Sequence, residues 1–317
     1  MDWTAHPGSL KALGDRNFAM GINRMVFHVN ALNPWLDKKP GMTLGGIGLF
    51  FQRDQTWYNQ SKAWIDYITR TSAVLQQGNP VTDIAVFTGE EIPRRSVLPD
   101  RLVSTLPGIF GNERVTQENI RIKNIAQPQR TKPIGVSHSA NMADPESWTD
   151  ALHGYKYDCF NPDVLMRMTV KDGKVITPGG AAYSVLVIPG KHLMQPNQFL
   201  SIETAIKLLQ LAKDGANIII PPEGWRTYES GERELDFRKI FFELFSKQNK
   251  RGQVVAAPFY DENFEQFGVQ PDVKLLSGKD TIAWTHRRTE NGEDIYFISN
   301  QQNENRKIDL SFRQNGK

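Results

Sequence analysis

Three consecutive segments between residues 181 and 222 constrain the fold most strongly. The first, AAYSVLVIPG, is a run of buried-type residues that predicts a strand. The second, FLSIETAIKLLQLAKDG, has the spacing of an amphipathic helix and ends at Gly215, which suits a helix C-terminus. The third, ANIIIPP, follows at once and predicts another buried strand. A strand, a helix and a strand with such short connections predict a parallel, doubly wound α/β sheet with a right-handed crossover.

The first part of the chain has a helix, strand and helix pattern. Residues 9–21 predict a helix that is capped by Ser9. The segment RMVFHVN, residues 24–30, is apolar on both faces, which is typical of a strand covered on both sides. Residues 31–59 predict a long irregular loop, and such a loop in a compact domain is usually functional. Residues 62–77 then predict a second amphipathic helix.

The remaining segments predict a second α/β region that is followed by antiparallel strands. VTDIAVFTG predicts a buried strand, residues 89–150 predict mostly loop, and residues 147–168 predict a helix and then a turn. The Asp-Gly pair at 172–173 predicts the tip of a hairpin. DFRKIFFELFSKQ predicts one more helix, and the Asn-Gly pair at 291–292 predicts a turn between two antiparallel strands.

Composition excludes several classes of protein. Hydrophobic residues make up 39% of the 317 residues and charged residues 23%, so a folded globular chain is expected. The net charge is +3 with Lys and Arg spread along the chain, so no nucleic acid partner is expected. No stretch approaches ~18 consecutive apolar residues, so no membrane span is expected. The N-terminus lacks the pattern of a signal peptide and is expected to begin within a fold.

An ordered set of short segments runs through nearly the whole chain: HPGSLKALGD, GINRMVFHVNALNPW, PGMTLGGIG, DIAVFTGE, YDCFNPDVL, YSVLVIPG and HRRTENGEDIYFISN. Together these segments resemble the bacterial α-L-rhamnosidases of glycoside hydrolase family 106. None of them alone is a catalytic signature, so the resemblance depends on their order.

The resemblance implies a division of the chain into three parts within an α/β fold class. Residues 1–80 would be the last helix, strand and helix of a (β/α)8 barrel. Residues 81–252 would be an amidotransferase-like, doubly wound α/β domain. Residues 253–317 would form antiparallel β ribbons in a β-rich C-terminal region.

The resemblance also implies the position of a substrate site. The active site of a (β/α)8 barrel lies at the C-terminal ends of its strands and in the loops that follow. A sugar site needs aromatic surface for the ring and polar groups for its hydroxyls. We expect substrate contacts from His28, Asn30, Trp35, Arg53 and Trp57. Each has a structural alternative, which is core packing for the histidine and the tryptophans and a loop clamp for the arginine.

No catalytic residue is assigned in this chain. An inverting glycosidase needs two carboxyl groups about 6.5–9.5 Å apart, and the resemblance places both on earlier barrel strands. No glutamate precedes Glu90, and Asp54 is the one aspartate that we expect near the pocket. The resemblance therefore implies that the full-length enzyme has an additional N-terminal barrel portion. It implies a rhamnose-containing oligosaccharide or glycoside as the partner and an inactive isolated chain.

Two other functions remain open. The first is a non-catalytic carbohydrate-binding or scaffold protein. The second is a complete small hydrolase that uses Cys159 or Glu90. Against it, the only cysteine lacks the flanking glycines of a nucleophile elbow, and Glu90 and Glu91 are neighbours at a strand end that point in different directions.

Expectations about a cofactor and about the cellular compartment come only from the family resemblance. No metal cluster or cofactor motif is expected, although the resemblance allows a calcium ion. Analogy with polysaccharide-degrading relatives places the parent enzyme in the periplasm or outside the cell, while the chain itself carries no localisation signal.

Overall fold

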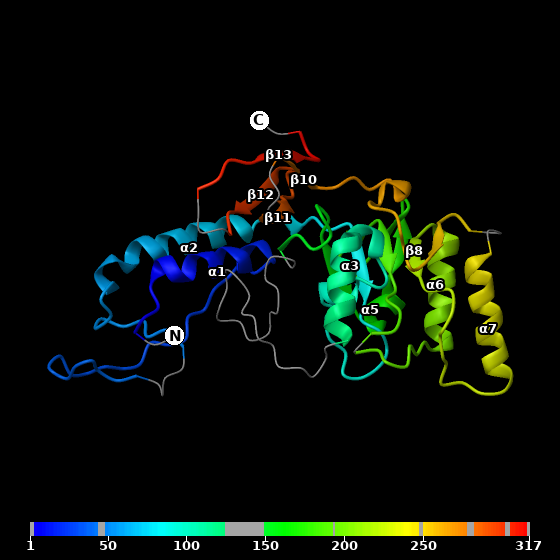
Figure 1. The fold of residues 1–317 in the computed structure, drawn as a ribbon, viewed down its shortest axis with the longest axis horizontal. Coiled ribbons are helices and arrows are strands. Elements are labelled where there is room, and N and C mark those ends of the chain that lie inside the picture. Colours follow the sequence, from blue (N-terminus) through cyan, green and yellow to red (C-terminus); the bar gives the residue numbers. More distant parts are fainter. Residues whose placement is uncertain are drawn as a thin grey trace. The chain divides into compact units, whose positions relative to one another are not determined.

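The computed structural model describes residues 3–43, 48–123, 149–192, 194–246, 250–277, 282–301 and 305–315 (Figure 1). The chain forms two compact units, each made of several segments. Unit 1 comprises Met1–Val81, Thr131–Thr149 and Asp280–Arg306. Unit 2 comprises Thr82–Arg130, Asp150–Lys279 and Lys307–Lys317.

Unit 1 contains two helices and a small antiparallel sheet. Its elements are α1 (Pro7–Ala19), η1 (Tyr58–Gln60), α2 (Ser61–Leu75), β1 (Asn79–Pro80), β11 (Ala283–Arg288) and β12 (Asp294–Ser299). The sheet has the order β1-β11-β12. The turn between β11 and β12 includes Gly292 at φ +83°, as the Asn-Gly pair predicts.

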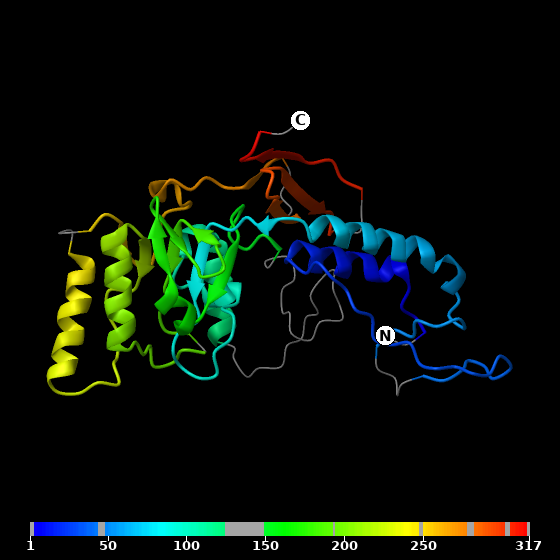
Figure 2. The ribbon, with the colours of Figure 1, turned by 180° about the vertical axis from the view of Figure 1, so that it is seen from behind.

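The core of unit 1 forms where the two helices meet the sheet. Phe18 of α1 is fully buried, and its ring lies 5.8 Å from that of Phe297 in β12. Trp64, Ile68 and Leu75 bury one stripe of α2, which confirms the predicted apolar face. Figure 2 shows α1 and α2 side by side, as their contacts require.

Helix α1 begins earlier than the sequence predicts. It begins at Pro7, a residue favoured in the first turn, and His6 occupies the N-cap position. The predicted cap Ser9 lies inside the helix, where its Oγ accepts from the His6 N–H at 3.1 Å and donates to the His6 carbonyl at 2.9 Å. The prediction of Ser9 as the N-cap is therefore wrong, although its hydroxyl still stabilises this end of the helix.

The prediction of a strand at residues 24–30 is also wrong. The segment belongs to no strand, and the side chain of Val26 is 88% exposed. A strand requires neighbours for its backbone groups. Within the described part of unit 1, this segment bonds only to the chain near Leu49 and Phe51. The glycine-rich residues 44–47 lie outside the described residues.

Unit 2 is built around a parallel sheet. Its helices are η2 (Pro99–Arg101), α3 (Pro107–Lys123), α5 (Pro162–Arg167), α6 (Ile202–Asp214), α7 (Glu232–Phe245) and η3 (Glu265–Phe267). Its parallel strands are β2 (Ile84–Phe87), β3 (Tyr157–Phe160), β7 (Val185–Val187), β8 (Asn217–Ile220) and β9 (Val254–Ala256), in the order β3-β2-β7-β8-β9. The segment from β7 through α6 to β8 confirms the predicted strand–helix–strand pattern.

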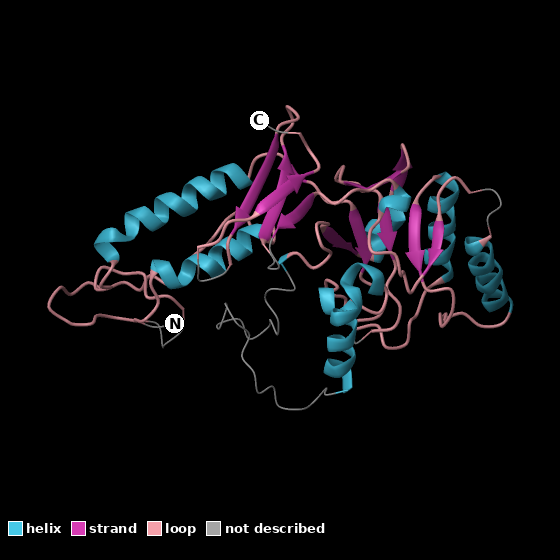
Figure 3. Ribbon diagram, turned by 45° about the horizontal axis from the view of Figure 1, so that its top comes forward, coloured by secondary structure: helices cyan, strands magenta, loops and turns pink. Residues whose placement is uncertain are grey.

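Both faces of this parallel sheet are covered. In β2, Ala85 and Phe87 join the core that includes α5, α6 and α7, whereas Ile84 and Val86 join the core that includes α3. This alternation explains why the buried strands are continuously apolar in sequence. Figures 1 and 3 show α6 and α7 together on one side of unit 2.

Two smaller sheets complete unit 2. One contains β4 (Thr169–Lys171), β5 (Lys174–Ile176) and β6 (Ala182–Tyr183), and the other pairs β10 (Val273–Ser277) with β13 (Asp309–Phe312). Asp172 and Gly173 have φ values of +52° and +74°, which confirms the predicted hairpin tip. The chain therefore has a mixed α/β fold with a parallel sheet and antiparallel sheets.

Two predictions for the middle of the chain are wrong. Helix α3 lies within the segment 89–150, which we predicted as mostly loop, whereas residues 124–148 of that segment lie outside the described residues. The predicted helix in 147–168 is replaced by strand β3 and the short helix α5. Among the described residues, no helix is long and apolar enough to cross a membrane.

Candidate functional site

The five predicted substrate residues lie in unit 1 between the end of α1 and the start of α2. His28 and Asn30 are exposed, and the described residues provide no hydrogen-bond partner for the Asn30 side chain. The backbone beside them is held, because the N–H of Leu49 donates to the His28 carbonyl at 2.7 Å. The N–H of Val29 donates to the Leu49 carbonyl at 2.8 Å. This part of the loop therefore presents polar side chains on a fixed backbone.

A glycine permits this close approach of the two segments. A Cβ at Gly48 would lie 2.3 Å from the His28 carbonyl oxygen and 2.6 Å from its Nδ1. Gly48 also has φ +87°, a conformation that other residues adopt only with strain. A glycine at this position is thus a condition for the orientation of His28.

Arg53 acts as a clamp on the loop. Its Nη2 donates to the backbone carbonyl of Asn33, and also to that of Trp35 at 3.1 Å. This arrangement matches the structural alternative given above for the arginine. Through it, Arg53 fixes the backbone on which the Trp35 ring is carried.

The two tryptophans differ in their surroundings. The Nε1 of Trp57 donates to the carbonyl of Ala5 at 2.9 Å, and its ring lies 5.5 Å from the ring of Phe51. The Trp35 side chain is 52% exposed and lines a cavity of about 280 Å³. The structure thus packs Trp57 within the unit and leaves Trp35 accessible to a ligand.

The cavity beside Trp35 brings together residues of a single loop. It is lined by Asn33, Trp35, Lys38, Lys39, Gly41 and Met42. Of these, the sequence predicted only Trp35 as a substrate contact. His28, Asn30, Arg53 and Trp57 do not line it.

A buried polar network lies next to this cavity. The Nδ2 of Asn33 donates to Oδ2 of Asp54 at 2.6 Å, and the ammonium of Lys39 pairs with Oδ1 of the same carboxylate. The Asp54 side chain is 4% exposed, so this carboxylate is enclosed by its partners. The Oδ1 of Asn33 is buried and has no hydrogen-bond partner among the described residues.

Gly41 makes room for this network. It has φ +89°, and a Cβ there would lie 2.1 Å from Nδ2 of Asn33 and 3.0 Å from Oδ2 of Asp54. Sequence reasoning missed Gly41 and Lys39. Their spacing from Asp54 has no recognisable periodicity, and only the folded loop brings them together.

The two glutamates after β2 bind the region around the start of α6. Oε1 of Glu90 accepts from the hydroxyls of Ser201 at 2.7 Å and Thr204 at 2.8 Å, and Oε2 accepts from the Ser201 N–H at 2.5 Å. The carboxylate of Glu91 accepts from the backbone N–H and the side-chain amide of Asn197, at 3.1 and 3.0 Å. Negative charge at a helix N-terminus is stabilising, so Glu90 has a structural role here.

Cys159 lies in β3 and is not arranged as a nucleophile. Burial raises the pKa of its thiol to about 11, so the reactive thiolate is scarce at neutral pH. Its Sγ accepts from the backbone N–H of Val97 at 3.3 Å. In the described part of the chain, no group of three His, Cys, Asp or Glu side chains could hold a metal ion.

Comparisons with known proteins place these features in a family. Residues 1–132 and 135–317 match the family model of glycoside hydrolase family 106, described as alpha-L-rhamnosidase. A protein of Formosa agariphila named "Putative beta-glucuronidase" is 31% identical over 318 residues, which cover 99% of this chain and 22% of that protein.

A solved structure gives the same indication. The rhamnosidase from Novosphingobium sp. PP1Y matches with a TM-score of 0.71 and 26% identity, over 100% of this chain and 26% of the solved chain. The chain thus spans about a quarter of the length of these two relatives. Because the family model matches nearly every residue, the chain belongs to glycoside hydrolase family 106, the α-L-rhamnosidase family.

Proposed function

We propose that this chain is the C-terminal segment of a glycoside hydrolase that cleaves terminal α-L-rhamnosides of plant or microbial glycans with inversion, using water as the nucleophile. The family match along both units carries this proposal. In it, the catalytic glutamate pair lies in an upstream portion, so that this chain contributes substrate contacts rather than the acid and the base.

We place the domain boundaries of the parent enzyme accordingly. Residues 1–80 complete a (β/α)8 barrel that the upstream portion begins, and residues 81–252 form an amidotransferase-like domain. Residues 253–317 open a β-rich region. Two helices flank the loop with the cavity, although residues 24–30 between them form no strand in this structure, and the parallel sheet has helices on both faces.

The proposed sugar contacts have distinct roles. Trp35 offers an exposed aromatic face to the ring of the sugar. His28 and Asn30 donate or accept hydrogen bonds at the hydroxyls, because both side chains are exposed. Arg53 and Trp57 hold the loop through their backbone partners.

A second candidate substrate is a glucuronide. The Formosa agariphila relative carries a glucuronidase name, and the cavity beside Trp35 is lined by Lys38 and Lys39. The Lys38 side chain is 69% exposed, and its 3.9 Å ion pair with Asp37 is long, so in this proposal its ammonium binds a sugar carboxylate instead. The rhamnoside remains the first proposal because the family model and the solved relative both carry that activity in their names.

A paired assay tests both candidates. The chain alone, and the chain joined to an upstream barrel portion of a family member, are offered an aryl α-L-rhamnoside and an aryl β-glucuronide. We expect cooperative unfolding of the isolated chain without turnover, and rhamnoside hydrolysis by the joined protein that Trp35→Ala lowers about tenfold or more, the effect of losing ~1.4 kcal/mol. Turnover by the isolated chain would contradict an upstream catalytic pair, and turnover of the glucuronide alone would favour the second candidate.

A further inference from the structure

Residues 22–30 of unit 1 have the burial pattern of a strand, although they belong to no strand (Figure 3). Half-buried and exposed side chains alternate strictly along this stretch. The half-buried side chains are those of Asn23, Met25, Phe27 and Val29, and the exposed ones are those of Ile22, Arg24, Val26, His28 and Asn30. A period of two residues is the pattern of an extended chain that rests one face on a core. The segment is therefore extended like a strand but has no sheet around it.

The inner face of this segment is held on unit 1. Met25 and Phe27 pack against the buried residues of α1 and α2. The ring of Phe27 also stacks on that of Phe51, with the centroids 5.7 Å apart. The side-chain amide of Gln76 donates to the carbonyl of Asn23 at 3.0 Å. These contacts fix the direction of the segment and thus the orientation of its outer face.

The backbone at the centre of the segment lacks neighbours. Only its end is bonded, where His28 and Val29 meet the chain near Leu49 as described above. Among the described residues, no group donates to or accepts from the backbone of residues 24–27. The N–H and carbonyl groups of a strand are normally paired with a neighbouring strand on each edge. Residues 24–27 therefore present two open edges.

The outer face of the segment is largely apolar. Ile22 and Val26 are exposed there, and the loop that follows adds Leu32 and Leu36, which are 81% and 71% exposed. Exposed edge strands are usually protected by lysine, proline or a bulge. Residues 22–30 contain neither lysine nor proline, and Arg24 is their only arginine. An apolar surface with so little protection is typical of one that another segment covers.

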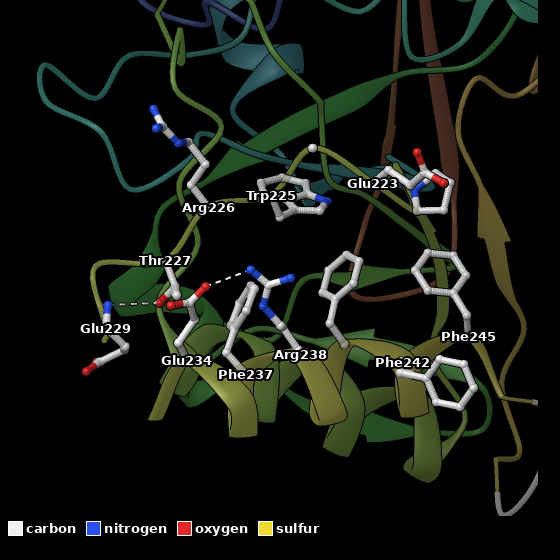
Figure 4. A pocket seen from close by; sticks show the side chains of 13 residues that line it. Glu223, Trp225, Arg226, Thr227, Glu229, Glu234, Phe237, Arg238, Phe242 and Phe245 are labelled. Carbon is white, nitrogen blue, oxygen red and sulfur yellow. Dashed lines mark hydrogen bonds and ion pairs between the residues drawn. The ribbon is translucent and has the colours of Figure 1, made fainter. Parts of the chain in front are cut away.

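Unit 2 also exposes a large apolar side chain, but in a different setting. Phe242 of α7 is 81% exposed and borders a cavity of about 580 Å³ (Figure 4). The backbone of α7 is hydrogen-bonded within the helix, so it offers no edge to which a strand could add. The open edges of residues 24–27 thus distinguish the surface of unit 1.

We propose that residues 22–30 are a preformed docking strand, which the upstream portion of the parent enzyme covers with β-strands along the open edges. The inference rests on the proposed function for the existence of that upstream portion. The kind of partner follows from the segment itself, because open backbone groups require a strand and the exposed Ile22 and Val26 require apolar side chains above them. This chain covers 22% and 26% of the two relatives, so most of each relative lies outside the matched part and can supply such strands. Docking would also fix His28 and Asn30, which end the segment beside the proposed sugar site.

Hydrogen–deuterium exchange, read by mass spectrometry, tests this docking in two proteins: the 317-residue chain, and the chain joined to an upstream barrel portion of a family member. In the 317-residue chain, we expect the amides of residues 24–27 to exchange nearly as fast as those of an unfolded peptide. In the joined protein, we expect exchange at least about a hundredfold slower, because amides within a sheet exchange only when it opens. The amides of β7 are the internal reference, since they are paired in the sheet of unit 2 and should be protected in both proteins.

Val26→Asp tests the outer face, and Val26→Ile is its conservative counterpart. Because Val26 is exposed, both variants should keep the unfolding midpoint of the 317-residue chain. In the joined protein, Val26→Asp should remove the protection of residues 24–27, since burying an unpaired carboxylate is costly. Val26→Ile should retain that protection. Phe242→Asp, which places the same charge on an exposed side chain of unit 2, should retain it as well.

The outcomes separate the docking strand from the proposed function. Fast exchange of residues 24–27 in a joined protein that hydrolyses the rhamnoside would overturn the docking strand and leave the proposed function intact. Protection of residues 24–27 in a joined protein without turnover would support the docking strand and count against the proposed function. Protection already present in the 317-residue chain would also overturn the docking strand, and sedimentation of that chain would show whether a second copy covers the segment instead.

Discussion

Asn33 and Asp54 are joined by a hydrogen bond of 2.6 Å between Nδ2 and Oδ2, across 21 residues of sequence. The bond connects the beginning and the end of the loop that carries Trp35. Since Lys39 pairs with the other oxygen of Asp54, both oxygens of this carboxylate are engaged. Asp54 therefore shapes the cavity and is poorly placed to serve as a catalytic base.

Replacing Gly41 by alanine should disturb this network more than a backbone effect alone would. We expect Gly41→Ala to lower the free energy of unfolding by roughly 1–3 kcal/mol beyond the cost of its positive φ, because the added Cβ overlaps Nδ2 of Asn33. The control is Gly21→Ala, which has φ +96° and nothing within 4 Å of the added Cβ. Urea unfolding of both variants measures the difference, and equal losses would contradict the overlap.

Glu90→Ala should destabilise unit 2. The substitution removes the acceptor for the Ser201 N–H and for two hydroxyl groups at the start of α6. We expect a loss of about 1–3 kcal/mol in the free energy of unfolding, as is typical when hydrogen bonds to a charged group are removed. Glu262→Gln serves as the control because Glu262 is exposed. Urea unfolding that leaves Glu90→Ala as stable as the parent would show that these bonds contribute nothing.

His192 should make the folded state less stable in acid. Burial, and secondarily the charge of Arg101, lowers its pKa to about 4 from the usual 6.5. Between these two values the unfolded chain binds a proton that the folded chain does not, so stability falls as the pH drops from about 6.5 to 4. His192→Asn should flatten this decline in urea unfolding from pH 7 to 4.5. A decline that His192→Asn leaves unchanged would contradict this role of the His192 imidazole.

Cys159 should react slowly with iodoacetamide. Burial raises its thiol pKa from 9.0 to about 11, which lowers the thiolate fraction at pH 8 by roughly a hundredfold. Mass spectrometry should show slow alkylation of the folded chain and rapid alkylation in urea. Alkylation of the folded chain at the rate of a free cysteine would contradict the enclosed position.

The raised pKa of the Cys159 thiol also affects the free energy of unfolding. Stability should decline as the pH rises from about 9 towards 11, because the thiol of the unfolded chain ionises first.

The sequence predicted the fold well where short-range signals mark the ends of a helix or strand. In α6, the Ser201 side chain caps the helix by accepting from the Thr204 N–H, and Gly215 at φ +122° ends it. Both signals act within a few residues of the helix end, so they can be recognised without the fold. Helix α3 lacked such clarity, because Gly111 adopts non-helical dihedral angles inside it.

The cavity beside Trp35 was harder to predict because its residues are brought together by contacts between distant parts of the loop. A tryptophan in the long loop after residues 24–30 pointed to Trp35, but its neighbours Lys39 and Gly41 were recognisable only through contacts with Asp54 and Asn33. Segment 24–30 has the composition of a buried strand, yet composition does not specify which strands will lie beside it. Hydrogen-bonding neighbours are a property of the tertiary fold and are absent from the local pattern.

The pairing of β1 with β11 has a consequence for synthesis of the protein. Arg287 donates to the carbonyls of Gln77 and Gly78 across 210 and 209 residues, and both partners belong to unit 1. A ribosome adds roughly 5–20 residues per second, so α2 is exposed for about 10 to 40 s before β11 is made. Unit 2 is largely complete within that interval. We therefore expect the interior of unit 2 to fold first, while the helices of unit 1 depend on chaperones until their sheet emerges.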